Sequence, residues 1–523
     1  MSAVTTGAVT FGAGALTFAI DDTGVAFLAL SAFLWLLSGI YAWVTVPAPG
    51  RARLFAWFVP AALGGVAVAL AADAVSFYLS FALMALPSWG LITHVRTPDS
   101  RRAGAIYLTV TVLGEALLLG ALMLLAARAG SLDLAALRAA AATSPLALGL
   151  VVGAIALKIG VLPASGVLPL TYLHAPAGAA AALAGASVKV GVLAMLRLLP
   201  LGSSLPQWQS ALIVLGVATA FGAAVLGVLT TSPRAVLGYS SASQMGLITI
   251  AAGVGLGGPE AGALATGAIV AYSIHHGLAK SALVLGDDVA ARTQGRGRIL
   301  ALAGLVLPAL ALVGAPLTSG FVAKYALKDA IHALNTPLAH TVEVLLPWAA
   351  VATAALMLRF LALVRARPAA QSSRAARPAA ALWGVVLLAV ALASWLWPAT
   401  WAEHAAASAL KPASLWPAVW PLLLALAAGA LIARLVTSVR LRRGILPPGD
   451  LLLALAAGVR MLDAAVGSRV AATRDPAAES PARRLLAALA RALAAVEEHL
   501  VAWAVASVVF AALAVLVVLL ATT

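Results

Sequence analysis

Residues 145–169 read PLALGLVVGAIALKIGVLPASGVLP. The stretch begins as an apolar run of the length that crosses a bilayer, since an α-helix spans the hydrocarbon in about 20 residues. Lys158 lies inside this run, and Pro163, Gly166 and Pro169 follow it closely. Proline has no amide hydrogen and glycine accepts irregular backbone, so neither favours a regular helix. The stretch therefore predicts a transmembrane helix that is broken beside a buried charge.

The composition of the whole chain also indicates a membrane protein. Of its 523 residues, 63% are hydrophobic and 10% are charged, whereas soluble chains carry about 25% charged residues. Runs such as 54–72 are apolar on every face, which excludes the alternating pattern of a transmembrane β-barrel. Because backbone polar groups in lipid must be satisfied within each helix, the predicted fold class is an all-α polytopic membrane protein.

Apolar runs divide the chain into about 14 predicted transmembrane helices. One run, 299–332, is too long for a single straight helix and contains Gly314, Pro316 and Gly320. It is either two helices or one broken crossing. The predicted spans are 26–46, 54–72, 74–95, 103–127, 145–164, 176–199, 208–230, 234–256, 262–286, 299–332, 343–366, 378–398, 414–439 and 500–521.

Basic residues decide between these alternatives. Basic loops follow predicted spans 1, 3, 7 and 9, which are all odd-numbered, so these loops share one side of the membrane. If 299–332 crosses once, the basic loops at 365–377 and 434–443 fall on that side as well, whereas two crossings would reverse them. Since cytoplasmic loops collect lysine and arginine, we predict one interrupted helix, cytoplasmic basic loops and external termini, in a bacterial inner membrane.

The two interrupted helices, near 158–169 and 314–324, are five predicted crossings apart. An odd offset gives the two blocks opposite orientations, which is the inverted-repeat pattern of transporters whose broken helices mark the pathway. Proline and glycine are common in membrane helices, but here a lysine lies beside each break. The predicted domains are the N-terminal segment and first helix (1–53), repeat A (54–199), repeat B (208–366), additional helices (378–439), a cytoplasmic amphipathic segment (440–499) and a C-terminal transmembrane helix (500–521).

The net charge and the absence of cysteine narrow the function. The 33 Lys and Arg against 18 Asp and Glu give +15, which we interpret as an orientation signal rather than a nucleic-acid surface. Asp287 and Asp288, at the end of a predicted span, are expected to be loop charges. Without cysteine the chain holds no thiolate iron–sulfur cluster. We find no phosphate loop, metal-ligand cluster or nucleophile elbow, and so predict no cofactor, no metal and no self-contained active site.

Seven ionisable residues lie inside the predicted spans, where a charge costs about 2.5–3.5 kcal/mol. Together they predict a hydrated polar axis that passes protons by alternately gaining and losing charge. Lysine suits this role because burial readily changes its proton affinity, and histidine titrates near physiological pH. The seven are Glu115, Lys158, Lys189, His275, His276, Lys280 and Lys324.

Some of these positions have simpler explanations. Glu115 could form a structural ion pair with Lys158. His275 points away from the helix face of the next histidine and could be a core residue. Lys328, one turn past Lys324, could act in its place.

These residues lie in segments that resemble the antiporter-like membrane subunits of respiratory complex I and the related subunits of membrane-bound hydrogenases and multi-subunit Na+/H+ antiporters. The resemblance covers residues 20–400. Segments TSPRAVLGYSSASQMG (231–246), HGLAK (276–280) and GAPLTSGFVAK (314–324) are similar to three family motifs. In the family's first broken helix, a lysine is followed by Pro-Leu-His-x-Trp-Leu-Pro, then by Ala-Pro and then by a second lysine. The residues of this chain that fall at the same spacing are Lys158, Pro163, Leu168, Pro169, Pro176, Gly185 and Lys189.

The resemblance implies a role for each buried lysine. Lys158 is implied to be the central proton carrier of a first half-channel, and Lys189 a further link. Lys280 is implied to be a connecting lysine, and Lys324 the terminal lysine of the second half-channel. His276 lies four residues before Lys280, on the same helix face, which suits either a relay or mutual orientation.

The chain departs from the family pattern at four positions. Ala82, in FALM (81–84), stands where the family has a membrane glutamate. Ser165 and Val167 stand where it has a histidine and a tryptophan after the break, and Tyr272 stands where it has an earlier histidine of the ninth span. Our hypothesis is that Glu115, on the next helix, supplies the missing carboxylate as a partner for Lys158.

The prediction is a proton-translocating, antiporter-like subunit of a multi-subunit inner-membrane complex, coupled to membrane and cytoplasmic partner subunits. It would be a translocase subunit of a complex similar to NADH:quinone oxidoreductase or hydrogenase. One alternative is a monovalent cation/H+ antiporter subunit carrying Na+, or a proton-flow subunit that energises a partner's solute uptake. Another is a non-conducting scaffold that anchors a cytoplasmic partner through 440–499.

Overall fold

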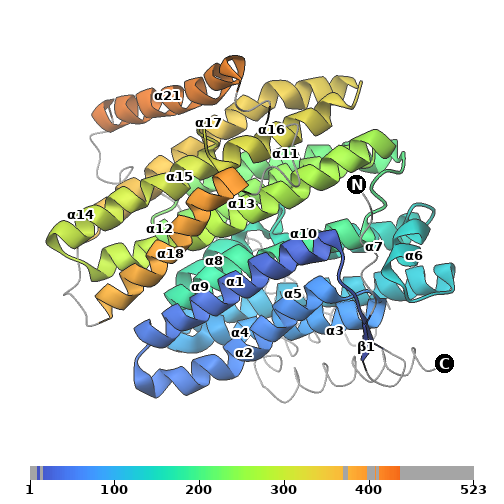
Figure 1. Cartoon of the computed structure of the whole chain (residues 1–523), viewed down its shortest axis with the longest axis horizontal. Helices are drawn as coiled ribbons and strands as arrows, with labels where there is room; N and C mark the ends of the chain where they lie inside the picture. Colours follow the sequence, from blue (N-terminus) through green and yellow to red (C-terminus); the bar gives the residue numbers. More distant parts are fainter. Residues whose placement is uncertain (1–8, 12–15, 369–374, 397–406, 408–410, 436–523) are drawn as a thin grey trace, which may run out of the picture. The chain divides into compact units, whose positions relative to one another are not determined.

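The computed structural model describes residues 9–11, 16–368, 375–396, 407 and 411–435. The described chain is almost entirely helical (Figure 1). A short antiparallel hairpin, β1 (Val9–Phe11) with β2 (Leu16–Phe18), precedes the first helix. The helices up to residue 198 are α1 (Asp22–Thr45), α2 (Ala48–Leu70), α3 (Ala74–Ala85), α4 (Ser88–Ile92), η1 (Thr93–Val95), α5 (Pro98–Ala129), α6 (Leu134–Ala141), α7 (Pro145–Ile159), η2 (Ala164–Gly166), α8 (Val167–His174), α9 (Ala177–Ala182), the π-helical η3 (Leu183–Ser187) and α10 (Val188–Leu198).

The second half of the described chain repeats this pattern of long helices. Its elements are α11 (Pro206–Leu229), α12 (Pro233–Val254), α13 (Pro259–Arg292), α14 (Gly295–Gly304), α15 (Val306–Val313), α16 (Ser319–His332), α17 (Pro337–Ala366), α18 (Ala376–Leu396) and α21 (Pro412–Leu435).

Within the described residues, eleven helical stretches are long and apolar enough to cross a membrane. This supports a multi-pass membrane protein, although not the predicted count of 14. The predicted span 234–256 forms α12, whose serines and Gln244 lower its hydropathy below that of the eleven, and this helix is buried among its neighbours. The predicted span 414–439 contributes the shorter apolar stretch Ser414–Ala430. The predicted span 500–521 and the segment 440–499 lie outside the described residues.

Both predicted breaks are present, and each begins at a glycine. Gly160 ends α7 with φ +72° and Gly314 ends α15 with φ +84°, backbone conformations that side chains other than glycine rarely adopt. After the first break the helix resumes at Val167, so Pro169 lies in the first turn of α8. After the second it resumes at Ser319 as α16.

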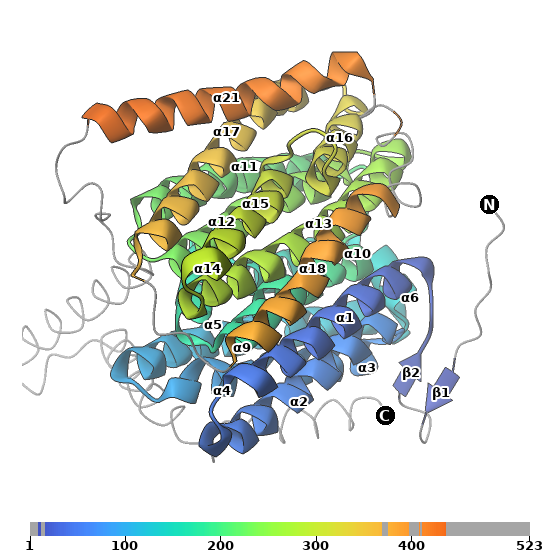
Figure 2. The ribbon, with the colours of Figure 1, turned by 60° about the vertical axis from the view of Figure 1, so that its left-hand side comes forward.

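The broken helices run in opposite directions, as inverted repeats require. In Figures 1 and 2, α14, α15 and α16 follow one another along one line, which makes 299–332 a single interrupted crossing. In Figure 1 the chain passes from α7 to α8 in the reverse sense. This arrangement agrees with the charge-based choice of one crossing.

The described basic loops that were predicted to share a side meet at one end of the helices, while the loop at 434–443 lies largely outside the described residues. Arg53 in α2 donates to a carbonyl of η1, at 3.1 Å. Arg298 in α14 donates to Val364 O near the end of α17, also at 3.1 Å. Tyr41 near the end of α1 donates to Asp288 near the end of α13, at 2.7 Å, which connects the two groups. We refer to this as the basic end.

A buried ion-pair network at the basic end corrects the expectation that Asp287 and Asp288 are loop charges. The Asp287 side chain is fully buried and pairs with Arg234 at 3.2 Å and with Arg367 at 3.1 Å. Asp288 pairs with Arg292 at 2.6 Å and lies 3.6 Å from Arg234. Because Arg234 begins α12 and Arg367 follows α17, the network joins three segments that are distant in the sequence.

Close backbone contacts hold the helices beside the first break. A Cβ on Gly238 of α12 would lie 2.3 Å from Pro169 Cα and 2.4 Å from its nitrogen, so only glycine fits there. Gly277 of α13 makes a similar approach to Gly185 in η3, whose Cβ would lie 2.1 Å from Ser281 Oγ. Small residues at such contacts are how membrane helices approach closely.

We expect Gly238→Ala to destabilise the protein by about 1–3 kcal/mol, because the added methyl group forces α12 and the backbone of α8 apart. The measurement is the melting temperature of the purified protein. Gly384→Ala in α18 is the matched control, since no atom lies within 4 Å of a Cβ at that position. A Gly238→Ala variant that melts at the same temperature as this control would contradict the expectation.

Candidate functional site

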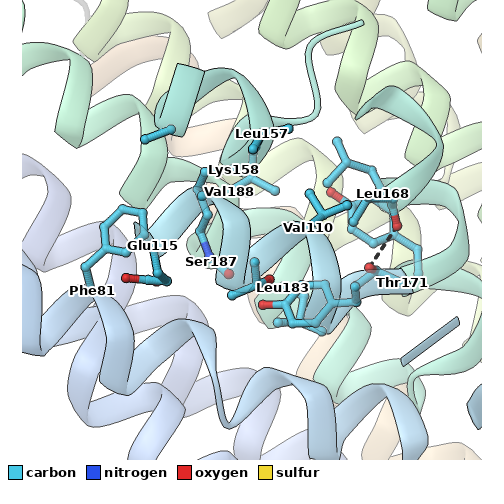
Figure 3. A pocket seen from close by; sticks show the side chains of 16 residues that line it. Phe81, Val110, Glu115, Leu157, Lys158, Leu168, Thr171, Leu183, Ser187 and Val188 are labelled. Atoms are coloured by element: carbon cyan, nitrogen blue, oxygen red, sulfur yellow. Dashed lines mark hydrogen bonds between the residues drawn. The ribbon is translucent and has the colours of Figure 1, made fainter. Parts of the chain in front are cut away.

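A small cavity lined by apolar residues and a few polar groups lies beside the first break, with a volume of about 40 Å³. This is room for more than one water molecule, each of which needs about 10–15 Å³. The wall comes from α3, α5, α7, α8 and η3, and includes Tyr107, Thr171, Tyr172 and Ser187. Figure 3 shows Glu115, Lys158 and Ser187 around it. The cavity brings together two predicted site residues, the lysine and the glutamate.

Lys158 enters this cavity from the last turn of α7, immediately before the break. Its Nζ lies 3.8 Å from Met84 Sδ and 5.3 Å from the centre of the Phe81 ring. Ser187 Oγ lies 3.0 Å from the same sulfur. Helix α3 therefore presents a thioether and an aromatic face to the lysine, beside Ala82, where the family has its glutamate.

Glu115 reaches the same cavity from the middle of α5. Its residue is 4% exposed, and neither carboxylate oxygen makes a hydrogen bond within the described part of the chain. Its charge and that of Lys158 attract one another, but the two side chains are not in direct hydrogen-bond contact. A buried carboxylate without a hydrogen-bond partner is an energetically costly arrangement, which is typical of a functional group rather than a structural ion pair.

The next contact joins the two repeats. Lys189 Nζ in α10 lies 2.6 Å from His276 Nδ1 in α13, and both residues are fully buried. The lysine also donates to Ala184 O, at 3.4 Å. It follows η3 directly, and a π-helical turn displaces the residues after it relative to a regular helix. This turn sets the direction in which Lys189 points.

Lys280 lies one turn beyond His276 on the same face of α13 and is also fully buried. Its Nζ donates to Leu237 O of α12, at 3.0 Å. The charge of Lys189 acts on both His276 and Lys280. The structure thus brings Lys189, His276 and Lys280 into one cluster, which we call the central cluster.

Lys324 is placed at the second break. It lies in α16 and its Nζ donates to Val313 O, the last residue of α15, so the lysine reaches back across the interruption. Pro316 lies in the break, and Gly320 is the second residue of α16. Lys328 has a different environment: its side chain is 40% exposed and forms an ion pair with Glu343, at 3.5 Å. The hypothesis that it acts in place of Lys324 finds no support.

Some neighbours of the predicted site residues carry no signal in the sequence. Met84 is one, because a thioether beside a lysine is not part of a recognisable spacing. His275 is another: its Nδ1 lies 2.9 Å from Ser319 Oγ at the start of α16. It is buried, as expected of a core residue, and it also contacts the second break, which the sequence does not indicate.

The fold and this site define a class: a polytopic transport subunit built from inverted repeats, with a broken helix in each and lysines in its interior. The family described as NADH:quinone oxidoreductase/Mrp antiporter, TM, matches residues 71–346, which is more than half of the 523 residues. The chain belongs to this family of antiporter-like membrane subunits, and the resemblance seen in the sequence is confirmed.

Relatives of the chain are found in bacteria. It is 30% identical over 353 residues to an uncharacterised protein of Mycobacterium tuberculosis strain H37Rv, covering 61% of this chain and 55% of that protein. It is 31% identical over 295 residues to NADH-quinone oxidoreductase subunit N of Ectopseudomonas mendocina, covering 53% and 60%. The chain thus matches less than two thirds of the length of each.

A solved structure shows the same fold. A chain of the membrane-bound sulfane sulfur reductase, an archaeal respiratory membrane complex, is 20% identical and has a TM-score of 0.65. The likeness covers 94% of this chain and 91% of that one. It extends beyond the family match, so the described helices outside 71–346 also belong to this architecture.

Proposed function

We propose that the chain carries protons across a bacterial inner membrane along one polar axis, coupled to partner subunits of a larger complex. The observation that carries this proposal is the contact of Lys189 with His276, because it connects repeat A to repeat B in the interior of the molecule. The axis consists of Glu115, Lys158, Lys189, His276, Lys280 and Lys324.

The geometry supports a stepwise transfer. Glu115 and Lys158 exchange a proton through water in the cavity at the first break, where both face the same space. Like charges repel strongly in a low-dielectric interior, so a proton arriving at Lys189 favours release from His276 or Lys280. Lys324, held across the second break, receives it at the far end.

The residue types along the axis favour H+ over Na+. Lysine and histidine bind protons but repel metal cations, and Glu115 is the single carboxylate among the six axis residues. Hard cations such as Na+ prefer several oxygen ligands. The named relatives, a subunit of an NADH-quinone oxidoreductase and a chain of a respiratory reductase, support partner subunits that perform the redox chemistry.

The proposal is tested with two lysines of one helix. The full-length chain, with the subunits that co-purify with it, is reconstituted in liposomes, and a potassium diffusion potential drives proton uptake that a pH-sensitive dye records. We expect Lys324→Ala to lower the rate about a hundredfold, the scale on which a positioned proton-transfer group contributes. Lys328→Ala, four residues away in an exposed ion pair, should leave the rate unchanged. Equal rates for the two variants would refute the proposal.

A further inference from the structure

His275 has the arrangement of a proton relay, although it lies outside the axis described above. Its ring is 2% exposed, Nδ1 is 2.9 Å from the Ser319 hydroxyl, and Nε2 has no hydrogen-bond partner among the described residues. A neutral imidazole can accept a proton on one nitrogen and release one from the other. A buried nitrogen without a hydrogen-bond partner costs free energy, which favours a functional role for this ring over a purely structural one.

The position of His275 joins two parts of the site. It lies on α13 next to His276 of the central cluster, and Ser319 is the first residue of α16, the helix that carries Lys324. The charges of Lys189, Lys280 and Lys324 all act on the ring.

The second break is shaped to admit this ring. A Cβ on Gly320 would lie 2.8 Å from His275 Nε2 and 1.8 Å from Ala311 O. The glycine therefore lets the imidazole approach the backbone where α15 gives way to α16. No other residue type leaves this space open.

Tyr272, an aromatic side chain of α13 near His275, bonds to another helix. Tyr272 donates its hydroxyl to Gln244 Oε1 at 2.6 Å, and Gln244 Nε2 donates to Thr353 Oγ1 at 3.0 Å. The phenol of Tyr272 thus bonds to α12 and, through Gln244, is connected to α17. His275 is the imidazole of α13 that contacts the second break.

We propose that His275 carries protons between the central cluster and Lys324. The inference rests on the proposed function. One proton reaches one ring nitrogen while another leaves from the opposite nitrogen, so the imidazole returns to its neutral form. The Ser319 hydroxyl accepts and donates in the same step and ends unchanged.

The test uses the reconstituted full-length chain with its co-purifying subunits and the dye assay of proton uptake. We expect His275→Gln to lower the rate about a hundredfold, because glutamine can bond to Ser319 but cannot pass a proton through itself. Tyr272→Phe is the matched control on the same helix and should keep its rate. Ser319→Ala is a second variant, expected to lower the rate while His275 is intact.

The outcomes separate the two proposals. If Lys324→Ala loses proton uptake and His275→Gln keeps it, the role of His275 is overturned while the axis stands. If Lys324→Ala also keeps its rate, the proposed function fails and the role of His275 fails with it. Where His275→Gln does not assemble, Ser319→Ala decides: a lowered rate supports the relay and an unchanged rate overturns it.

Discussion

Lys158→Ala should reduce proton uptake about a hundredfold or more and leave the protein assembled. The reason is local: Lys158 is the basic group of the cavity at the first break, its contacts are a thioether and an aromatic ring, and Glu115 lines the same cavity. None of these contacts holds a second helix in place through the ammonium group. Removing it leaves Glu115 with no basic partner in the cavity, so the pathway is interrupted at its first step.

Two companion variants distinguish proton transfer from charge. Lys158→Arg keeps a positive charge but does not release its proton in proteins, so it should be as inactive as the alanine variant. Glu115→Gln should also lower the rate, since the carboxylate is the other titratable group of the cavity. Rates are measured by the dye assay, with the amount of co-purifying subunits as the check on assembly. An active Lys158→Arg would show that charge alone suffices, and an active Glu115→Gln would remove this glutamate from the axis.

Asp287→Ala should destabilise the protein more strongly than Gly238→Ala does. The carboxylate is fully buried between Arg234 and Arg367. Its removal takes from Arg367 its ion pair with Asp287 and leaves Arg234 with the longer, 3.6 Å approach to Asp288. Breaking a buried ion pair on one side typically costs about 3–5 kcal/mol, a large part of a total stability of about 5–15 kcal/mol. The expected result is a sharply lower melting temperature and little assembled protein in the membrane.

Glu343→Ala is the matched control for this prediction. Glu343 pairs with Lys328 at 3.5 Å and with His332 at 2.8 Å, but its side chain is 33% exposed. Exposed ion pairs contribute about 0–1 kcal/mol, so this variant should assemble and melt nearly as the parent does. If Asp287→Ala behaves like Glu343→Ala, the network does not stabilise the fold.

The large features of the molecule can be predicted from the sequence because they follow from hydropathy and charge. Pro163 and Gly314 beside lysines predict the broken helices, and the side on which arginines gather predicts the single crossing at 299–332. Both depend on local composition, because apolar stretches span the bilayer and loops rich in Lys and Arg stay on its cytoplasmic side. The cavity shared by Glu115 and Lys158 is also consistent with the hypothesis of a displaced carboxylate.

Other features depend on packing between distant segments. The π-helical turn η3 has no signature in LAGAS, yet it precedes Lys189 and sets its direction toward His276. Asp287 resembles a loop charge in the sequence because its arginine partners come from α12 and from the chain after α17. Helical spacing separates His275 from His276 and gives no sign of Ser319, which is why the sequence alone suggests a core residue.

Three of the buried or partly buried lysines share a type of hydrogen-bond acceptor, which affects the substitutions that the surrounding sequence can accept. Lys189, Lys280 and Lys324 each donate to a backbone carbonyl, of Ala184, Leu237 and Val313. Every amino acid supplies that acceptor, so no substitution at these three positions removes it. Sequence drift can therefore alter the side chains around the pathway, as at Ala82, Ser165 and Tyr272, while the lysines keep their anchors. An insertion or deletion that moves the helix register is the kind of mutation that would take the anchors away.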